Sequence, residues 1–159
     1  IIALNNSKVE RLELISTALA SYDHGQSNPK NVLLSEMCRK LSKELREPYL
    51  RVIFSYIASG NWLYVLQQQE ELALLDRVGI ALRFLDDDEL STYLSNATNK
   101  AKVAGDIEGI ILTGLTSDGV TLFEKYVDNT GDVQTASLAM SFCVPRKFKD
   151  DRVLDWIEK

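Results

Sequence analysis

Histidine, cysteine and proline are scarce in this sequence of 159 residues, which contains one histidine, two cysteines and three prolines. A structural zinc site needs four Cys or His ligands, so Cys38, Cys143 and His24 cannot form one by themselves. Any Ser-His-Asp or Cys-His catalytic arrangement would need His24, and the chain has no nucleophile motif such as Gly-x-Ser-x-Gly. His24 stands in a polar segment, which favours a solvated loop residue. The two cysteines are widely separated, which suits a reducing compartment, and lie on apolar stripes, which predicts small buried hydrophobes.

Excess positive charge and long apolar runs are also missing. The chain has 18 Lys and Arg against 23 Asp and Glu, a formal net charge of −5, so nucleic acid is not an expected partner. No apolar run approaches the ~18 residues that span a bilayer, and residues 1–4 lack the charged start of a signal peptide. Hydrophobic residues make up 45% of the chain, so we expect a soluble domain with a core and no membrane insertion.

Helical periodicity runs along the whole chain, and no stretch alternates with period two for long enough to form a strand. Glycine is followed by Asn or Asp at Gly60-Asn61, Gly105-Asp106 and Gly131-Asp132. Such a glycine can end one helix while the Asn or Asp caps the next. The spacings are irregular, which predicts an all-α fold, an irregular α-solenoid of antiparallel helix pairs with about 8 to 10 helices.

Capping residues and prolines predict where the first helices begin. These starts are Ser7, Asn28-Pro29, Pro48, Asn61, Glu70 and Asp86. The first helix ends near Tyr22, and residues 67–71 are predicted to break the helices on either side because they interrupt the apolar stripe. The helix from Pro48 is apolar almost all round, so we expect neighbours to cover it on both sides.

Residues 104–136 are the central segment of the predicted fold. One apolar stripe continues from Ile107 to Leu115 on a helix capped by Asp106, and a second continues from Val120 to Val127. We expect Gly119 to supply the left-handed turn between them, giving an antiparallel helical hairpin. A helix from Asp132, a stop at Pro145 and a last helix capped by Asp150 or Asp151 follow.

Two pairs of glycines, Gly105 with Gly109 and Gly114 with Gly119, have spacings that invite comparison with phosphate loops. A phosphate loop needs a preceding strand and, in the Walker form, Lys-Ser/Thr after the last glycine, and neither is present. Helix ends and close crossings explain them better. Gly79 and Gly109 inside helices each cost about 1 kcal/mol, so we expect a neighbouring helix to pass over each.

Acidic and aromatic residues are the remaining candidates for a site. Asp86, Asp87, Asp88 and Glu89 are consecutive, unlike the spread ligands of a calcium loop, so we interpret them as a helix cap. Trp62, Tyr64, Tyr126 and Trp156 can be partner anchors, but core packing is favoured for each. We predict no catalytic, cofactor-binding or metal-binding residue, and therefore no cofactor and no enzyme activity.

Four motifs resemble the region after the propeller of the missing-oocyte (Mios) family. They are LDRVGIALRFL at 75–85, GDIEGIILTGLTSDG at 105–119, YVDNTGDVQTAS at 126–137 and DRVLDWIE at 151–158. The likeness is dense from Leu72 to Lys159. The resemblance implies that residues 1–159 are a single α-solenoid segment of a longer protein, with an N-terminal WD-repeat propeller and a C-terminal zinc module outside it.

The resemblance also implies a function. Proteins of this family belong to the SEA/GATOR complex, which relays amino-acid sufficiency to the TOR kinase. The chain is then expected to be a non-catalytic scaffold whose partners are other WD-repeat subunits and a small Seh-type propeller. Its expected location is cytoplasmic, at the cytosolic face of the lysosomal or vacuolar membrane.

A second hypothesis is a small-molecule sensor or enzyme with an interhelical pocket. In an enzyme, the acids from Asp86 to Glu89 together with Asp118 would act as general acid and base. Nothing in the sequence places them on a common cleft.

Overall fold

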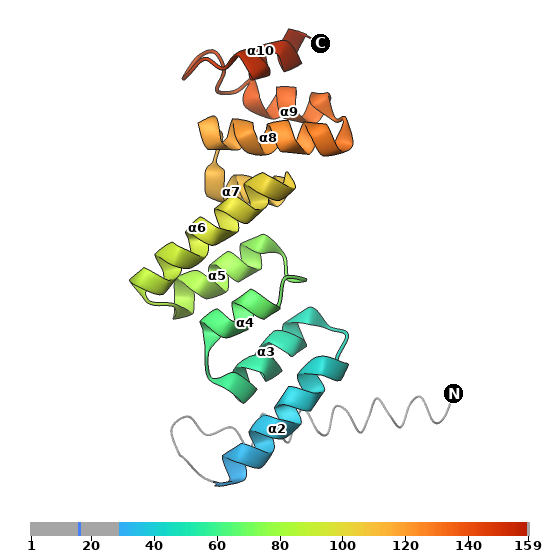
Figure 1. Ribbon diagram of the computed structural model, residues 1–159, viewed down its shortest axis with the longest axis vertical. Coiled ribbons are helices and arrows are strands. Elements are labelled where there is room, and N and C mark those ends of the chain that lie inside the picture. The colour runs from blue at the N-terminus through green and yellow to red at the C-terminus, as the bar shows by residue number, and fades with distance from the viewer. Residues whose placement is uncertain (1–15, 17–28, 159) are drawn as a thin grey trace, which may run out of the picture. The chain divides into compact units, whose positions relative to one another are not determined.

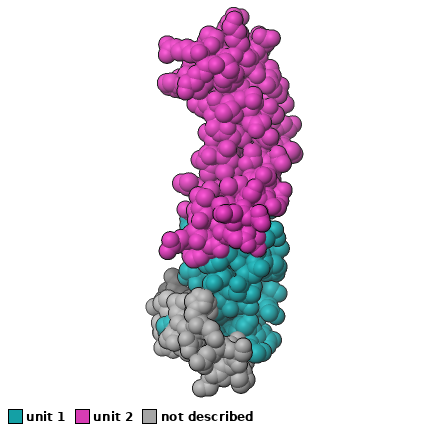
Figure 2. All heavy atoms as spheres, turned by 90° about the vertical axis from the view of Figure 1, so that its left-hand side faces the viewer, with its two compact units in different colours: residues 1–72 teal, residues 73–159 magenta. Residues whose placement is uncertain are grey.

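The computed structural model describes Ser16 and residues 29–158 (Figure 1). Regular structure within 29–158 is entirely helical, with nine α-helices, one 3-10 helix and no strand, which confirms the predicted all-α fold. His24 and, apart from Ser16, the predicted helix from Ser7 to Tyr22 lie outside the described residues. The chain divides into two compact units, unit 1 of residues 1–72 and unit 2 of residues 73–159, coloured separately in Figure 2.

Three helices form the described part of unit 1: α2 (Pro29–Glu44), α3 (Pro48–Ser59) and α4 (Trp62–Gln68). α3 packs against both α2 and α4. Cys38, Leu41 and Phe54 are buried together between α2 and α3, and the Ser35 hydroxyl donates a hydrogen bond of 2.8 Å to the Ala58 carbonyl. α3 begins at its proline, as predicted.

The expectation that α3 is covered on both sides is confirmed, because α2 and α4 both pack against it, but not all apolar residues of α3 are buried. Its residues Val52 and Phe54 are buried, but Tyr49 is 56% exposed and Ile53 is 40% exposed. Because α2 and α4 contact α3 along only part of its circumference, an apolar strip remains on its outer side.

The predicted break after α4 is confirmed, but the next helix begins at Leu74 rather than at Glu70. The Arg51 guanidinium contacts the Gln69 side chain at 3.0 Å and the Glu71 carboxylate at 2.9 Å. These contacts hold the connecting segment against α3 in a turn. The Leu74 amide donates a hydrogen bond of 2.8 Å to the Glu108 carboxylate, which provides a start for the helix that follows.

Unit 2 contains six α-helices and one short 3-10 helix in its described part. They are α5 (Leu74–Phe84), α6 (Asp87–Ala104), η1 (Ile107–Gly109), α7 (Ile110–Thr113), α8 (Ser117–Thr130), α9 (Val133–Met140) and α10 (Asp151–Glu158). α8 is the central helix, because it packs against α6, α7, α9 and α10. Its Val120 and Phe123 are buried with Met140 of α9 and Val153 of α10 in one core.

The three predicted glycine joints are confirmed. Gly60, Gly105 and Gly131 end their helices in the left-handed conformation, with φ of 66°, 65° and 72°. At each joint the following Asn or Asp side chain accepts a hydrogen bond, of 2.9, 3.1 or 3.0 Å, from an amide in the first turn of the next helix. Two residues therefore end one helix and start the next.

The central hairpin differs from its prediction in two respects. The helix expected from Ile107 to Leu115 is instead a 3-10 turn followed by α7, which ends at Thr113. The left-handed residue is Gly114, with φ of 61°, and not Gly119, which is buried in the first turn of α8. A side chain at Gly119 would meet the Gly114 carbonyl, so this glycine permits close packing rather than a turn.

The prediction for the two helical glycines is confirmed for one and wrong for the other. A Cβ at Gly109 would contact Ala101 of α6 and would lie 2.8 Å from the side chain of Leu122 of α8. At Gly79 on α5 a Cβ would meet nothing within 4 Å, so no neighbouring helix explains that glycine.

Candidate functional site: a groove in unit 1 and exposed apolar residues in unit 2

The acidic candidates lie at a helix start, as predicted. The Asp86 carboxylate accepts a hydrogen bond of 2.8 Å from the Glu89 amide and caps α6. Asp118 instead forms an ion pair of 3.3 Å with Lys102, in the last turn of α6. Since a helix rises ~1.5 Å per residue, Lys102 lies roughly 24 Å along α6 from the Asp86 cap. The structure therefore does not bring these acids into one catalytic cleft, and the described residues include no cluster of metal ligands.

The two cysteines are buried and free, as predicted. Cys38 is fully buried and Cys143 is 7% exposed. Burial raises the pKa of the Cys38 thiol, which disfavours the reactive thiolate. Both residues act as small core side chains.

Three of the four aromatic candidates pack inside their units, and Tyr64 does not. Trp62 stacks on Tyr56 with ring centroids 4.0 Å apart. The Tyr126 ring packs against the unit 2 core, its hydroxyl donates a hydrogen bond of 3.0 Å to Asp132, and Trp156 packs against the same core. Tyr64 is 54% exposed, so the core prediction is wrong for this residue.

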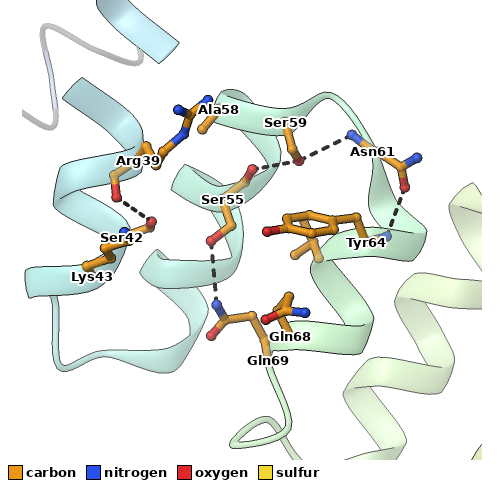
Figure 3. Close-up of a pocket in the computed structure, with 11 residues that line it drawn as sticks. Arg39, Ser42, Lys43, Ser55, Ala58, Ser59, Asn61, Tyr64, Gln68 and Gln69 are labelled. Carbon is orange, nitrogen blue, oxygen red and sulfur yellow. Dashed lines mark hydrogen bonds between the residues drawn. The ribbon is translucent and has the colours of Figure 1, made fainter. Parts of the chain in front are cut away.

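The exposed tyrosine borders a groove of about 760 Å³ within unit 1, which we call the unit 1 groove. Figure 3 shows side chains from α2, α3, α4 and their connections around it. The lining residues are Arg39, Ser42, Lys43, Ser55, Ala58, Ser59, Asn61, Tyr64, Val65, Gln68 and Gln69.

Short side chains on α3 make room for the groove. Ser55, Ala58 and Ser59 are spaced three and four residues apart and so share one helix face. The Ser59 hydroxyl donates to the Ser55 carbonyl at 2.8 Å, and the Gln69 amide donates to the Ser55 hydroxyl at 3.5 Å (Figure 3). These bonds hold the short polar side chains of Ser55 and Ser59 in place at the floor of the groove. The spacing of these small residues on α3 is the signal in the sequence that could have indicated a groove on this helix face.

The charges around the groove have one sign. Arg39 and Lys43 line the α2 side, and none of the described residues that line the groove is acidic. Neither cation forms an ion pair with another described residue, whereas Arg51, Lys102 and Arg152 all do. Among the described residues that line the groove there is no histidine or cysteine.

Unit 2 exposes large apolar side chains on several helices. Leu138 on α9 is 69% exposed, and Phe142, in the connection that follows α9, is 70% exposed. Val103 at the end of α6 is 77% exposed, and Leu75 on α5 is 66% exposed. Neighbouring exposed apolar residues of this size are typical of surfaces that contact other proteins. In the described ranges, no helix is both long and apolar enough to cross a membrane.

Consecutive short helices, several of them joined by two-residue caps, place this chain among the α-solenoid proteins. A family model described as "MIOS, alpha-solenoid" matches residues 2–84. The chain belongs to this family. The family model covers the first half of the chain, whereas the motifs that carry the resemblance lie mainly in the second half.

Relatives match nearly the whole chain. The chain is 44% identical to SEH-associated protein 4 of Saccharomyces cerevisiae over 98% of its length, covering 15% of that protein. It is 47% identical to a WD repeat-containing protein of Schizosaccharomyces pombe over 99% of its length, covering 18% of it. It is 44% identical to GATOR2 complex protein MIOS of Danio rerio over 92% of its length, covering 17% of it. The chain thus spans less than a fifth of the length of each of these relatives.

Proposed function

We propose that this chain is a non-catalytic scaffold segment of a SEA/GATOR-type complex, which holds subunits together and thereby supports amino-acid signalling to the TOR kinase. Its membership of the Mios α-solenoid family supports the proposal. So do the names of its relatives, SEH-associated protein 4 and GATOR2 complex protein MIOS. Residues 1–159 act as one α-solenoid segment of a longer protein, between a propeller and a zinc module, and hold no cofactor.

The exposed apolar pair on unit 2 carries the proposal. Leu138 on α9 is 69% exposed, and Phe142, just after the end of α9, is 70% exposed. Burying a side chain of this kind against a partner is worth about 1.5–3 kcal/mol. A pair of such residues can therefore contribute substantially to holding a subunit, and neither residue contributes to the unit 2 core.

The proposed partners are other WD-repeat subunits of the complex and a small Seh-type propeller. The proposed location is the cytosolic face of the lysosomal or vacuolar membrane, reached through the assembled complex. The chain acts by geometry, because stacked helices hold attached modules at fixed separations.

Co-purification tests the scaffold function. The double variant Leu138→Asp/Phe142→Asp, made in the full-length protein, is expected to lose partner subunits and to weaken TOR activation by amino acids. Gln134→Asp is the control for each of the two substitutions, because it adds one aspartate at an exposed polar position of α9. Retention of every subunit and of TOR signalling by the double variant would contradict the proposal, provided that circular dichroism shows both variants to be equally helical.

The unit 1 groove also gives the small-molecule sensor hypothesis a location. Its volume of about 760 Å³ is in the range of ligand sites. Most of the side chains that line it are serine, amide or charged, whereas ligand sites are lined mainly by hydrophobic and aromatic side chains. A thermal-shift screen with metals, nucleotides and amino acids tests the sensor, since a ligand that binds the folded state raises the melting temperature.

A further inference from the structure

We infer that the unit 1 groove binds an acidic segment of a partner protein, with Arg39 and Lys43 contacting its carboxylates. The inference rests on the proposed scaffold function, because the occupant is a segment of another subunit. It adds the chemistry of the partner and the place on this chain where it lies.

Charge complementarity favours this occupant. The chain carries a net charge of −5, yet the described residues that line the groove include two cations and no acid. Arg51, which lies on α3 outside the groove lining, is neutralised by Glu71 at 2.9 Å, but Arg39 and Lys43 have no such partner among the described residues. An acidic segment would supply the missing counter-charges, and ion pairs of this kind fix the register of a bound partner.

The spacing of the cations suits an extended peptide. Arg39 and Lys43 are four residues apart on α2, so their Cβ atoms are about 5–6 Å apart on one face. Alternate side chains of an extended segment are about 6.6 Å apart. Two acids separated by one residue can therefore contact both cations at once.

The opposite side of the groove supplies neutral contacts. Tyr64 and Gln68 project from α4, as Figure 3 shows. The exposed tyrosine ring offers an apolar surface to the segment, and the Gln68 amide offers hydrogen bonds to its backbone. Between the two sides, the short side chains of α3 leave space for the backbone itself.

The small number of cations argues against a polyanion such as nucleic acid. Two cations neutralise one or two charges, whereas a nucleic acid carries a charge on every phosphate. The net negative charge of the chain would repel the remaining phosphates. A protein segment with a few carboxylates matches the groove better.

Photocrosslinking in the assembled complex tests the inference. Tyr64 is replaced by p-benzoylphenylalanine in the full-length protein, the purified complex is irradiated, and the crosslinked peptide is sequenced by mass spectrometry. We expect one partner segment with Asp or Glu at alternate positions. Arg39→Glu/Lys43→Glu is expected to reduce the crosslink at least about tenfold, because each reversal replaces attraction by repulsion.

Arg39→Glu and Lys43→Glu are also made singly, and Lys40→Glu is the matched control for each, because it makes the same reversal at an exposed position of α2 that does not line the groove. Its crosslink yield should stay within about twofold of the unreversed protein. Arg39→Gln/Lys43→Gln checks that removal of charge without reversal also lowers the yield.

Three results would overturn the inference: a crosslink to a segment without acids, a crosslink only to residues of this same chain, or no crosslink. None of them depends on the Leu138 and Phe142 experiment. If the double variant of those residues releases subunits while position 64 finds no acidic segment, the groove inference fails and the scaffold function stands. If that variant retains all subunits and signalling, the scaffold function fails instead.

Discussion

Gly109 has no side chain because two neighbouring helices occupy the space that a side chain would need. A Cβ there would contact Ala101 and would lie 2.8 Å from a methyl group of Leu122. Gly109→Ala is therefore expected to lower the free energy of unfolding by about 1–3 kcal/mol, the usual cost of overpacking. Urea unfolding followed by circular dichroism measures the change.

Gly79 provides the matched control for this prediction. It lies in α5, and a Cβ at this position would have no neighbour within 4 Å. Gly79→Ala is expected to raise the free energy of unfolding by up to about 1 kcal/mol, because alanine favours the helix and meets no obstacle. If both substitutions changed the free energy of unfolding equally, the close packing around Gly109 would not be what excludes a side chain there.

Asp132 connects α8 to α9 through three hydrogen bonds. Its carboxylate accepts from the Thr135 hydroxyl at 2.6 Å, the Thr135 amide at 3.0 Å and the Tyr126 hydroxyl at 3.0 Å. These bonds, those from Thr135 first, lower the pKa of Asp132 below its usual value. The ionised form is thus stabilised in the folded state.

The pKa of Asp132 predicts an acid-dependent loss of stability. Above the unfolded-state pKa of about 3.9 the stabilisation is fully present. As the pH falls, the unfolded chain binds the proton first, so the stabilisation is lost as the pH passes through the lowered folded-state pKa. Asp132→Asn should therefore flatten the decline of the urea midpoint between about pH 5 and pH 3. Asp128→Asn, an exposed position on α8, is the control, and an equal flattening there would contradict the assignment.

At the scale of helices, the joints differ in how much they restrict a side chain. Gly131 requires only the left-handed conformation, with φ of 72° and open space around it. Gly105 has φ of 65° and also approaches α8, since a Cβ would lie 2.7 Å from backbone atoms of Lys125 and Tyr126.

Alanine substitution should separate these two requirements. Gly131→Ala is expected to destabilise unit 2 by about 1–2 kcal/mol, the cost of a left-handed L-residue. Gly105→Ala is expected to cost more, because α8 must also move away. Thermal melts of the two variants test which substitution lowers the melting temperature more. A smaller decrease for Gly105→Ala would contradict the close approach of Gly105 to α8.

The joints could be predicted from sequence because each depends on two adjacent residues. The turn between α7 and α8 could not, because Gly114 and Gly119 are both suitable and the decision depends on packing. Gly119 is buried against the Gly114 carbonyl, so it belongs to the helix and leaves the turn to Gly114. Periodicity alone carries no information about that contact.

Long-range contacts account for the other errors. The start of α5 at Leu74 is associated with a hydrogen bond to Glu108, which lies far away in sequence. The unit 1 groove combines Arg39 of α2 with Tyr64 of α4, and its depth depends on Ser55 of α3. No local pattern brings three helices together, so periodicity places the candidate residue Tyr64 in the core.

At the scale of the whole chain, two separate cores are present in the described residues. Phe54 is buried with Cys38 and Leu41 in unit 1, and Phe123 is buried with Met140 in unit 2. Replacing a buried phenylalanine by alanine typically costs about 3–5 kcal/mol. Contacts in a solenoid are mainly between neighbours, so each loss should be greatest within its own unit.

Hydrogen exchange read by mass spectrometry tests this prediction. Phe54→Ala is expected to accelerate amide exchange in α2 and α3, and Phe123→Ala in α8 and α9. Leu82→Ala removes a side chain that is 61% exposed and should change exchange little in either unit. Uniform acceleration across residues 29–158 by either phenylalanine variant would show a single cooperative unit instead.

The two-residue joints also determine where a protease can cut the folded chain. A protease binds several substrate residues in an extended conformation. A joint of two residues between capped helices is too short to provide such a segment. The longest connection in the described part of the chain is 141–150, between α9 and α10. It exposes Arg146, Lys147 and Lys149, the residue types after which trypsin cuts. Cleavage there would separate α10 from α9 along the chain, leaving α10 attached to unit 2 by the packing of Val153 in the core and by the ion pair of 2.7 Å between Arg152 and Glu124 of α8.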